Sequence, residues 1–280
     1  MQLISAIDEL RRHIHVWREA GLRIGFVPTM GNLHAGHLML LEEAARHCDR
    51  IIASIFVNPL QFDQPMDLAA YPRTLETDIT QLKNIGVDAL FAPDELTLYP
   101  HGREAVTRVE VMGLSDILEG AARPGHFTGV ATVVTKLFNC VQPDLAVFGE
   151  KDFQQLLVIR RLVADLNMPV EIVGMPTVRE ADGLAMSSRN QRLSAHERKR
   201  APELYRLLQT VRDTLLNENR EPVVLEQEAT KQLTQLGFEP EYVAIRDADT
   251  LFDINKSTQN RVILAAARLG NTRLIDNLRI

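Results

Sequence analysis

The stretch "RIGFVPTMGNLHAGHLMLLEEAARHC", residues 23–48, decides the fold. Its first six residues form a short apolar run typical of a strand, and residues 36–48 have the apolar spacing of a helix. A polar turn, residues 29–35, lies between them. A strand, a short turn and a helix form the first half of a βαβ unit, so we expect the surrounding sequence to repeat this pattern.

The alternation continues through residue 176. The remaining apolar runs predict strands at 50–57, 88–93, 144–149 and 170–176, and helical spacing predicts helices at 5–21, 73–86, 125–141 and 151–167. We expect Ser5 to cap the first helix. Apolar strands that alternate with amphipathic helices are typical of a parallel sheet covered on both faces. We therefore predict an α/β fold with a Rossmann-like, doubly wound parallel sheet, whose ligands bind at the carboxyl ends of the strands.

Beyond Pro176 the pattern changes. Residues 177–194 are polar and lack periodicity, residues 195–217 read as one long charged helix, and a second helix is expected from Pro222. Three apolar segments follow, and the turn signal Gly270-Asn271 separates the last two. These features predict a smaller C-terminal α+β domain over residues 177–280, joined to a Rossmann-like domain over residues 1–176.

Composition excludes several classes of protein. The formal charge of −6 argues against a nucleic-acid-binding surface, so a polyanionic ligand must meet a local cluster of positive charge. Cys48 and Cys140 lack C-x-x-C spacing, which favours two reduced thiols over a zinc site or a disulfide framework. The N-terminus does not resemble a signal peptide, and the longest apolar stretch, residues 262–267, is too short to span a bilayer. We expect a cytoplasmic protein with no membrane and no nucleic-acid partner.

His34 and His37 lie where the first predicted strand passes into its helix. The unpaired N–H groups of a helix's first turn, together with the helix dipole, favour an anion at this point. Gly36 has no Cβ, so a nucleotide can approach the backbone closely. Both imidazoles can reach one bound group, and their N–H donors suit phosphate oxygens. These residues favour a phosphate-binding site at the start of the helix.

Other interpretations of the two histidines compete with this one. A phosphate loop of the G-x-x-x-x-G-K-[ST] type requires a lysine, and none follows Gly31 or Gly36 at that spacing. A metal site at His34 and His37 needs further ligands, and neither an H-E-x-x-H motif nor a nearby cysteine supplies them. Two structural histidines that satisfy their local surroundings remain open from this stretch alone.

His34-Ala35-Gly36-His37 matches the H-x-G-H signature of the nucleotidyltransferase superfamily, and "MSSRN", residues 186–190, is similar to its second signature, a mobile loop commonly written K-M-S-K-S. Six segments resemble the pantothenate synthetase (pantoate–β-alanine ligase) family: "FVPTMGNLHAGH", "NPLQF", "YPRT", "RPGHFTGVATVV", "FGEKDFQQ" and "MSSRN". They occur in the family's order through both predicted domains. One departure is Leu60, where many members carry methionine, and the similar volume should preserve the apolar wall.

The resemblance implies a two-step reaction. The carboxylate of pantoate attacks the α-phosphorus of ATP to form pantoyl adenylate and pyrophosphate. The amine of β-alanine then attacks the activated carbonyl and releases AMP and pantothenate. Charge builds on phosphate oxygens in the first step, so N–H donors and positive groups must converge there. Two alternatives remain: an H-x-G-H nucleotidyltransferase that retains AMP on its product, and a nucleotide-sensing protein without turnover.

The resemblance also implies roles for individual residues. Those expected to be catalytic are His37, His34, Lys151 and Arg189. Those expected to bind ATP are Met30, Gly31, Asn32, Leu33, His34, Ala35, Gly36, His37, Gly149, Glu150, Lys151, Asp152, Val178, Met186, Ser187, Ser188 and Arg189. Gln61 and Gln155 are expected to bind pantoate or β-alanine, with Pro28, Met30 and Phe62 packing against the methyl groups of pantoate. Whether His37 transfers a proton or only stabilises phosphate stays open.

Mg²⁺ is expected with ATP, held mostly by phosphate oxygens and water. Glu76, Asp78 and Asp88 are candidates for its outer contacts, and the sequence does not choose among them. The family is usually homodimeric, so a homodimer is expected here, with small molecules as the other partners.

Overall fold

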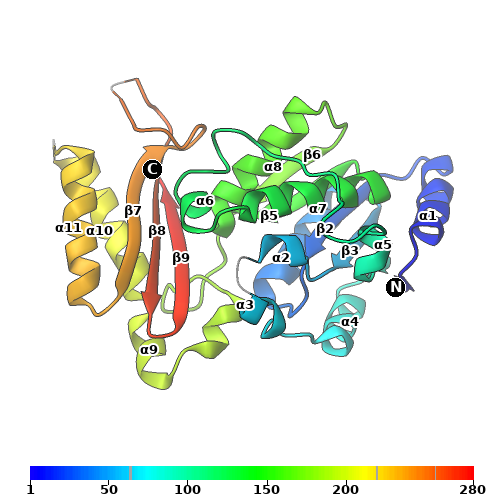
Figure 1. Cartoon of the computed structure of the whole chain (residues 1–280), viewed down its shortest axis with the longest axis horizontal. Helices are drawn as coiled ribbons and strands as arrows, with labels where there is room; N and C mark the ends of the chain where they lie inside the picture. Colours follow the sequence, from blue (N-terminus) through cyan, green and yellow to red (C-terminus); the bar gives the residue numbers. More distant parts are fainter. Residues whose placement is uncertain (63–64, 219, 256) are drawn as a thin grey trace. The chain divides into compact units, whose positions relative to one another are not determined.

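The computed structural model describes residues 1–62, 65–218, 220–255 and 257–280. The chain forms two compact units (Figure 1). The first comprises residues 1–150 and 158–175, and the second comprises residues 151–157 and 176–280. The predicted division of functions between residues 1–176 and 177–280 stays a prediction.

The first unit is built on a six-stranded sheet in the order β1-β4-β3-β2-β5-β6. Its strands are β1 (Gln2–Ile4), β2 (Ile24–Thr29), β3 (Arg50–Ile55), β4 (Ala89–Phe91), β5 (Leu145–Gly149) and β6 (Glu171–Met175). Every neighbouring pair is parallel. The chain moves outward from β2 to β3 and β4, and it resumes on the other side of β2 with β5 and β6. The direction of winding therefore reverses between β2 and β5, as in a doubly wound sheet.

Helices connect these strands. They are α1 (Ile7–Glu19), α2 (Ala35–His47), α3 (Pro65–Ala69), α4 (Leu75–Asn84), α5 (Glu95–Leu98), α6 (Glu119–Ala122), α7 (His126–Val141) and α8 (Phe153–Asp165). Short 3₁₀ turns occupy Pro59–Gln61 and Glu150–Asp152. One face of the sheet is covered by α2 and α4, whose buried cluster with three neighbouring strands includes Val27, Ala53, Leu90, Leu41 and Leu82.

The opposite face carries an aromatic contact to α7. Phe26 of β2 and Phe148 of β5 each pack edge-on against Phe138, with ring centroids 6.3 Å apart in both pairs. Neighbouring residues of a strand point to opposite faces, so Phe26 and Val27 place α7 and α2 on different sides. α1 packs against α7. Helices therefore cover both faces, and the predicted fold class is confirmed.

Two helix predictions were wrong in detail. Ser5 does not cap α1, because β1 extends to Ile4 and the N-cap position falls at Ala6, which makes no side-chain cap hydrogen bond. The long charged helix is broken into α9 (Ala195–Arg200) and α10 (Glu203–Asn217). Pro202 lies at the break, since a proline has no N–H to continue the hydrogen-bond ladder of a helix.

The second unit contains an antiparallel sheet of β7 (Glu239–Asp247), β8 (Arg261–Leu269) and β9 (Thr272–Arg279). The last two strands form the predicted hairpin at Gly270, whose φ of 57° suits glycine. α10 and α11 (Pro222–Gln235) pack on the sheet, and their buried cluster includes Leu204, Leu208, Leu225, Leu233, Val243 and Ile263. Among the described residues, no helix is long and apolar enough to cross a membrane.

Gly129 brings α7 against the 3₁₀ turn Pro59–Gln61. A Cβ at this position would lie 2.3 Å from the carbonyl oxygen of Leu60. Gly129→Ala is therefore expected to destabilise the fold by about 1–3 kcal/mol through overpacking, although alanine favours a helix interior by about 1 kcal/mol. Urea unfolding measures the change. Gly149→Ala is the control, because its Cβ would meet no atom of the described chain within 4 Å. Equal stability of the two variants would contradict the expectation.

Candidate active site

The first candidate segment follows β2 at the carboxyl edge of the sheet and opens α2. His34 is the N-cap residue of α2, and its Nδ1 accepts a hydrogen bond from the backbone N–H of Gly36 at 3.2 Å. In return, the backbone N–H of His34 donates to Nδ1 of His37 at 3.3 Å. The two ring centroids lie 4.1 Å apart. The sequence correctly placed His34 in the turn and His37 in the first helical turn, although the helix begins at Ala35.

This reciprocal cap determines which ring nitrogens carry protons. A backbone N–H can only donate, so both Nδ1 atoms must accept, and a neutral imidazole then carries its proton on Nε2. Both histidines therefore have a structural task at Nδ1 and carry the ring proton on Nε2. The structural and the phosphate-binding interpretations of the two histidines are compatible.

The loop between β2 and α2 is supported by Asp78 of α4, which is 1% exposed. Its carboxylate accepts from the backbone N–H groups of Asn32 and Leu33, both at 2.9 Å, and from the hydroxyl of Thr74 at 3.1 Å. Both carboxylate oxygens of Asp78 thus accept hydrogen bonds from other groups of the protein. Asp88 lies at the amino end of β4, where it accepts from the backbone of Ile51, so it is at the opposite edge of the sheet from the histidines. Neither geometry suits an outer contact to Mg²⁺ beside these histidines.

Backbone conformation also shapes this loop. Gly31 and Asn32 have φ angles of 80° and 51°, in the left-handed region. The side chain of Asn32 is 8% exposed, and its Nδ2 has no hydrogen-bond partner among the described residues. A buried amide donor in this condition costs free energy unless a ligand or water accepts from it.

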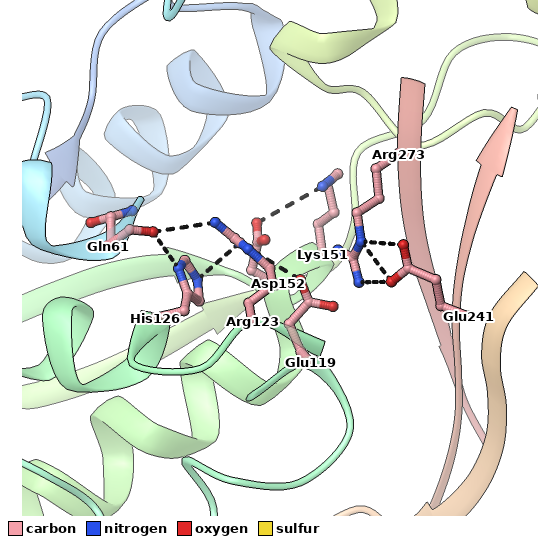
Figure 2. Close-up of polar contacts among 8 residues, drawn as sticks. All are labelled: Gln61, Glu119, Arg123, His126, Lys151, Asp152, Glu241 and Arg273. Carbon is pink, nitrogen blue, oxygen red and sulfur yellow. Dashed lines mark hydrogen bonds and ion pairs between the residues drawn. The ribbon is translucent and has the colours of Figure 1, made fainter. Parts of the chain in front are cut away.

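The second candidate segment follows β5, which pairs with β2 through Phe26 and Ala146. Gly149 ends β5 at the same carboxyl edge as the histidine loop, and the reversal of the winding falls between the two strands. Ligands of doubly wound sheets bind at this reversal. Lys151 and Asp152 continue the segment as a 3₁₀ turn, with Nζ and Oδ2 4.0 Å apart (Figure 2), and half-buried Gln155 lies in the first turn of α8.

Gln61 ends the turn after β3, the strand next to β2. The amide NH₂ of Asn58 donates to Oε1 of Gln61 at 3.0 Å, and Tyr99 donates to Oδ1 of Asn58 at 2.7 Å. Burial raises the pKa of the Tyr99 phenol above its ordinary value, which keeps it a donor. Because Asn58 occupies its amide oxygen, Gln61 has its own NH₂ group to offer to a ligand.

The backbone of Gln61 is held by Arg123 and His126, which lie in the "RPGHFTGVATVV" segment but were not predicted as site residues. Its carbonyl oxygen accepts from Nδ1 of His126 at 2.8 Å and from Nη2 of Arg123 at 3.2 Å (Figure 2). Nη1 of Arg123 lies 3.3 Å from Nε2 of His126 and 3.7 Å from Oε1 of Glu119. Arginine only donates, so Nε2 of His126 accepts and its proton lies on Nδ1. The i, i+4 spacing of Glu119 and Arg123 was a signal for this pair.

The third candidate segment lies in the second unit. Residues 178–186 form a short antiparallel turn, with the backbone N–H of Met186 donating to the carbonyl of Val178 at 2.9 Å. Ser187 then caps the 3₁₀ turn Ser188–Arg192 by accepting from the backbone N–H of Arg189 at 3.3 Å. The structure thus brings Val178 beside the "MSSRN" segment.

The sequence matches the family described as pantoate-beta-alanine ligase over residues 2–279. The chain belongs to this family. It is 56% identical to the pantothenate synthetase of Thioalkalivibrio sulfidiphilus, covering 99% of this chain and 97% of the relative, and 55% identical to that of Chromohalobacter salexigens, covering 100% and 99%. The resemblance read from the six motifs is confirmed, and so is the prediction that the chain is an enzyme of the ligase class.

Solved structures of the family agree with the fold. Pantothenate synthetase from Thermus thermophilus has a TM-score of 0.90 at 47% identity, covering 99% of each chain. Pantoate-beta-alanine ligase from Francisella tularensis, described as complexed with beta-gamma ATP and beta-alanine, has a TM-score of 0.81 at 35% identity, covering 99% of this chain and 97% of that one.

In the described part of this chain, no group of three or more His, Cys, Asp or Glu side chains could hold a metal ion.

The hydrogen bonds at the three histidines predict opposite tautomers. At about pH 8, neutral His34 and His37 are expected to carry the proton on Nε2, and neutral His126 is expected to carry it on Nδ1. Long-range proton–nitrogen NMR correlations of the rings distinguish these forms. His34→Gln, His37→Gln and His126→Gln assign the signals. A ring proton on Nδ1 of His34 or His37 would contradict the reciprocal cap.

Proposed function

We propose that this enzyme joins pantoate and β-alanine in an ATP-dependent reaction that forms pantothenate. Pantoyl adenylate is the intermediate, and AMP and pyrophosphate are released. Family membership supports the overall reaction, and the ATP and β-alanine named for the Francisella tularensis relative support two of the substrates. The observation that carries the proposal is the position of His34 and His37 at the amino end of α2, with both rings oriented by the reciprocal cap, beside the reversal of the sheet.

In the first step, the carboxylate of pantoate attacks the α-phosphorus of ATP and negative charge grows on phosphate oxygens. The Nε2–H groups of His34 and His37 and the backbone N–H groups of α2's first turn stabilise that charge. The buried Nδ2 of Asn32 supplies a further donor, which supports a polar ligand at this loop. A hydrogen bond from His37 is sufficient for this role, and the proposal requires no proton transfer from it.

ATP contacts extend over the three segments. Met30 to His37 contact the nucleotide through the loop and α2, and Gly149 and Glu150 lie against its sugar. Lys151 places a positive charge on the phosphates, and Asp152 accepts from the ribose hydroxyls. Val178 and Met186 contact adenine, while Ser187, Ser188 and Arg189 bind the triphosphate. Mg²⁺ binds with ATP through phosphate oxygens and water.

Pantoate is recognised by amides and an apolar wall. The NH₂ group of Gln61 donates to a pantoate oxygen, because Asn58 holds the amide in that orientation. Gln155 supplies a second amide, and Pro28, Met30 and Phe62 pack against the methyl groups. We also propose that the enzyme is a cytoplasmic homodimer, as the family resemblance implies.

The order of the two steps can be tested without β-alanine. Because adenylate formation precedes amide formation, labelled pyrophosphate should exchange into ATP when only pantoate and Mg²⁺ are added. Omission of pantoate is the control. Exchange that requires β-alanine would overturn the adenylate intermediate, and AMP retained on the product would indicate a nucleotidyltransferase instead.

Lys151→Ala should separate the two half-reactions. Charge moves onto phosphate oxygens when pyrophosphate departs, whereas amide formation shifts less charge near this ammonium. Loss of one preorganised donor at such a centre costs about 10²–10³ in rate, so adenylate formation should slow by about this factor. Amide formation from supplied pantoyl adenylate should change much less.

Single-turnover measurements of each half-reaction test this expectation. Lys83→Ala, in the last turn of α4, is the control for loss of a lysine charge elsewhere. Equal slowing of both half-reactions by Lys151→Ala would make Lys151 a general binding or folding residue.

A further inference from the structure

Two consecutive buried polar residues interrupt the alternation of β9. Asp276 is 4% exposed and Asn277 is 6% exposed, although successive strand residues normally face opposite sides. Their side chains bind different segments of the second unit. These segments are residues 151–157, which begin with Lys151, and residues 178–186, which lead into "MSSRN".

Asp276 holds the second of these segments through Arg179. The carboxylate accepts from Nη1 and Nη2 of Arg179 at 2.6 and 2.8 Å, a bidentate pair that fixes distance and orientation. Arg179 also donates to the carbonyl oxygens of Gly183 and Asn277, and it stacks 3.5 Å from the ring centroid of Tyr205. Because Arg179 pairs with Ala185 across the turn, this anchor lies at the base of the segment that presents residues 187–189.

Asn277 holds the first segment. Its Nδ2 donates to the backbone carbonyl of Lys151 at 3.0 Å. Its own backbone N–H donates to Oδ1 of Asp276 at 2.7 Å, and the same oxygen accepts from Arg179. One carboxylate oxygen therefore joins the support of Lys151 to the support of residues 178–186.

We infer that Asp276 and Asn277 are positioning residues that hold Lys151 and the "MSSRN" segment in a fixed relation to each other. They touch neither substrate nor reacting atoms in this role, and act through the backbone of Lys151 and the guanidinium of Arg179. The functional part of the inference rests on the proposed function. The reaction slows when the groups that bind the phosphates are displaced by even about 1 Å, so the chemistry requires such a support.

Hydrogen exchange of the ligand-free protein tests the coupling independently of activity. Asp276→Asn should speed amide exchange in both segments, because it weakens the hydrogen bonds to Arg179 and to the backbone of Asn277. Asn277→Ala should speed exchange mainly at residues 151–157. Thr272→Val is the matched control, a buried residue of β9 whose hydroxyl has no hydrogen-bond partner among the described residues. Unchanged exchange at residues 151–157 in Asp276→Asn, or faster exchange throughout the chain, would overturn the inference.

Kinetics test the functional part. Asn277→Ala leaves the Asp276–Arg179 pair in place, and should slow pantoate-dependent pyrophosphate exchange about 10-fold to 10²-fold. Amide formation from supplied pantoyl adenylate should change much less. In a Lys151→Ala background, Asn277→Ala should have little further effect, because its action passes through Lys151.

The two tests distinguish two failures. Multiplicative effects of Asn277→Ala and Lys151→Ala would assign Asn277 a general structural role and overturn the inference. Absence of pyrophosphate exchange in the unmodified enzyme would overturn the proposed function, and the hydrogen-exchange result would still decide whether the two segments are coupled.

Discussion

The reciprocal hydrogen bonds of His34 and His37 are the interaction on which the proposed chemistry depends. An aspartate would cap α2 with comparable stability, but its carboxylate has no proton to donate to an anion. An imidazole has a second nitrogen, and the cap leaves the proton there. The same two side chains thus cap the beginning of a helix and carry their ring protons at its positive end. Buried Asp78 holds the preceding loop, so the donors do not have to be ordered again when a substrate arrives.

The sheet determines where this pair can act. β2 and β5 are neighbours across the reversal of the winding, and each continues at its carboxyl end into a candidate binding segment. β3, on the other side of β2, leads to Gln61. The carboxyl ends of three strands that are far apart in the chain therefore lie along one edge of the first unit. α7 packs closely against the turn that carries Gln61, because Gly129 has no Cβ that would separate them.

Much of this arrangement could be predicted from the sequence, since it depends on local patterns. Strands such as 144–149 are continuous apolar runs, and the H-x-G-H motif places its histidines by spacing alone. The break between α9 and α10 at Pro202 is a local feature, whereas the other errors came from interactions between distant residues. Ser5 is not a cap because β1 pairs with β4, and a three-residue strand has too few positions to show a period. The supports of Gln61 and Lys151 were missed because His126 and Asn277 lie 65 and 126 residues away from them in the chain. No periodicity connects such residues.

The hydrogen bond between Asn277 and Lys151 has a consequence for how the enzyme folds during synthesis. A ribosome makes Lys151 long before Asn277, and the hydrogen bond between them spans 126 positions of sequence. The strands and helices of the first unit can pack while translation is still in progress, because N-terminal domains generally fold first. The hydrogen bonds of Asn277 to Lys151 and of Asp276 to Arg179 cannot form until β9 has been made. We therefore expect a stage of synthesis in which the histidine pair is in place while Lys151 and residues 178–186 still lack the hydrogen bonds from β9. The support that the second unit gives to the proposed activation of a carboxylate therefore arises late in synthesis.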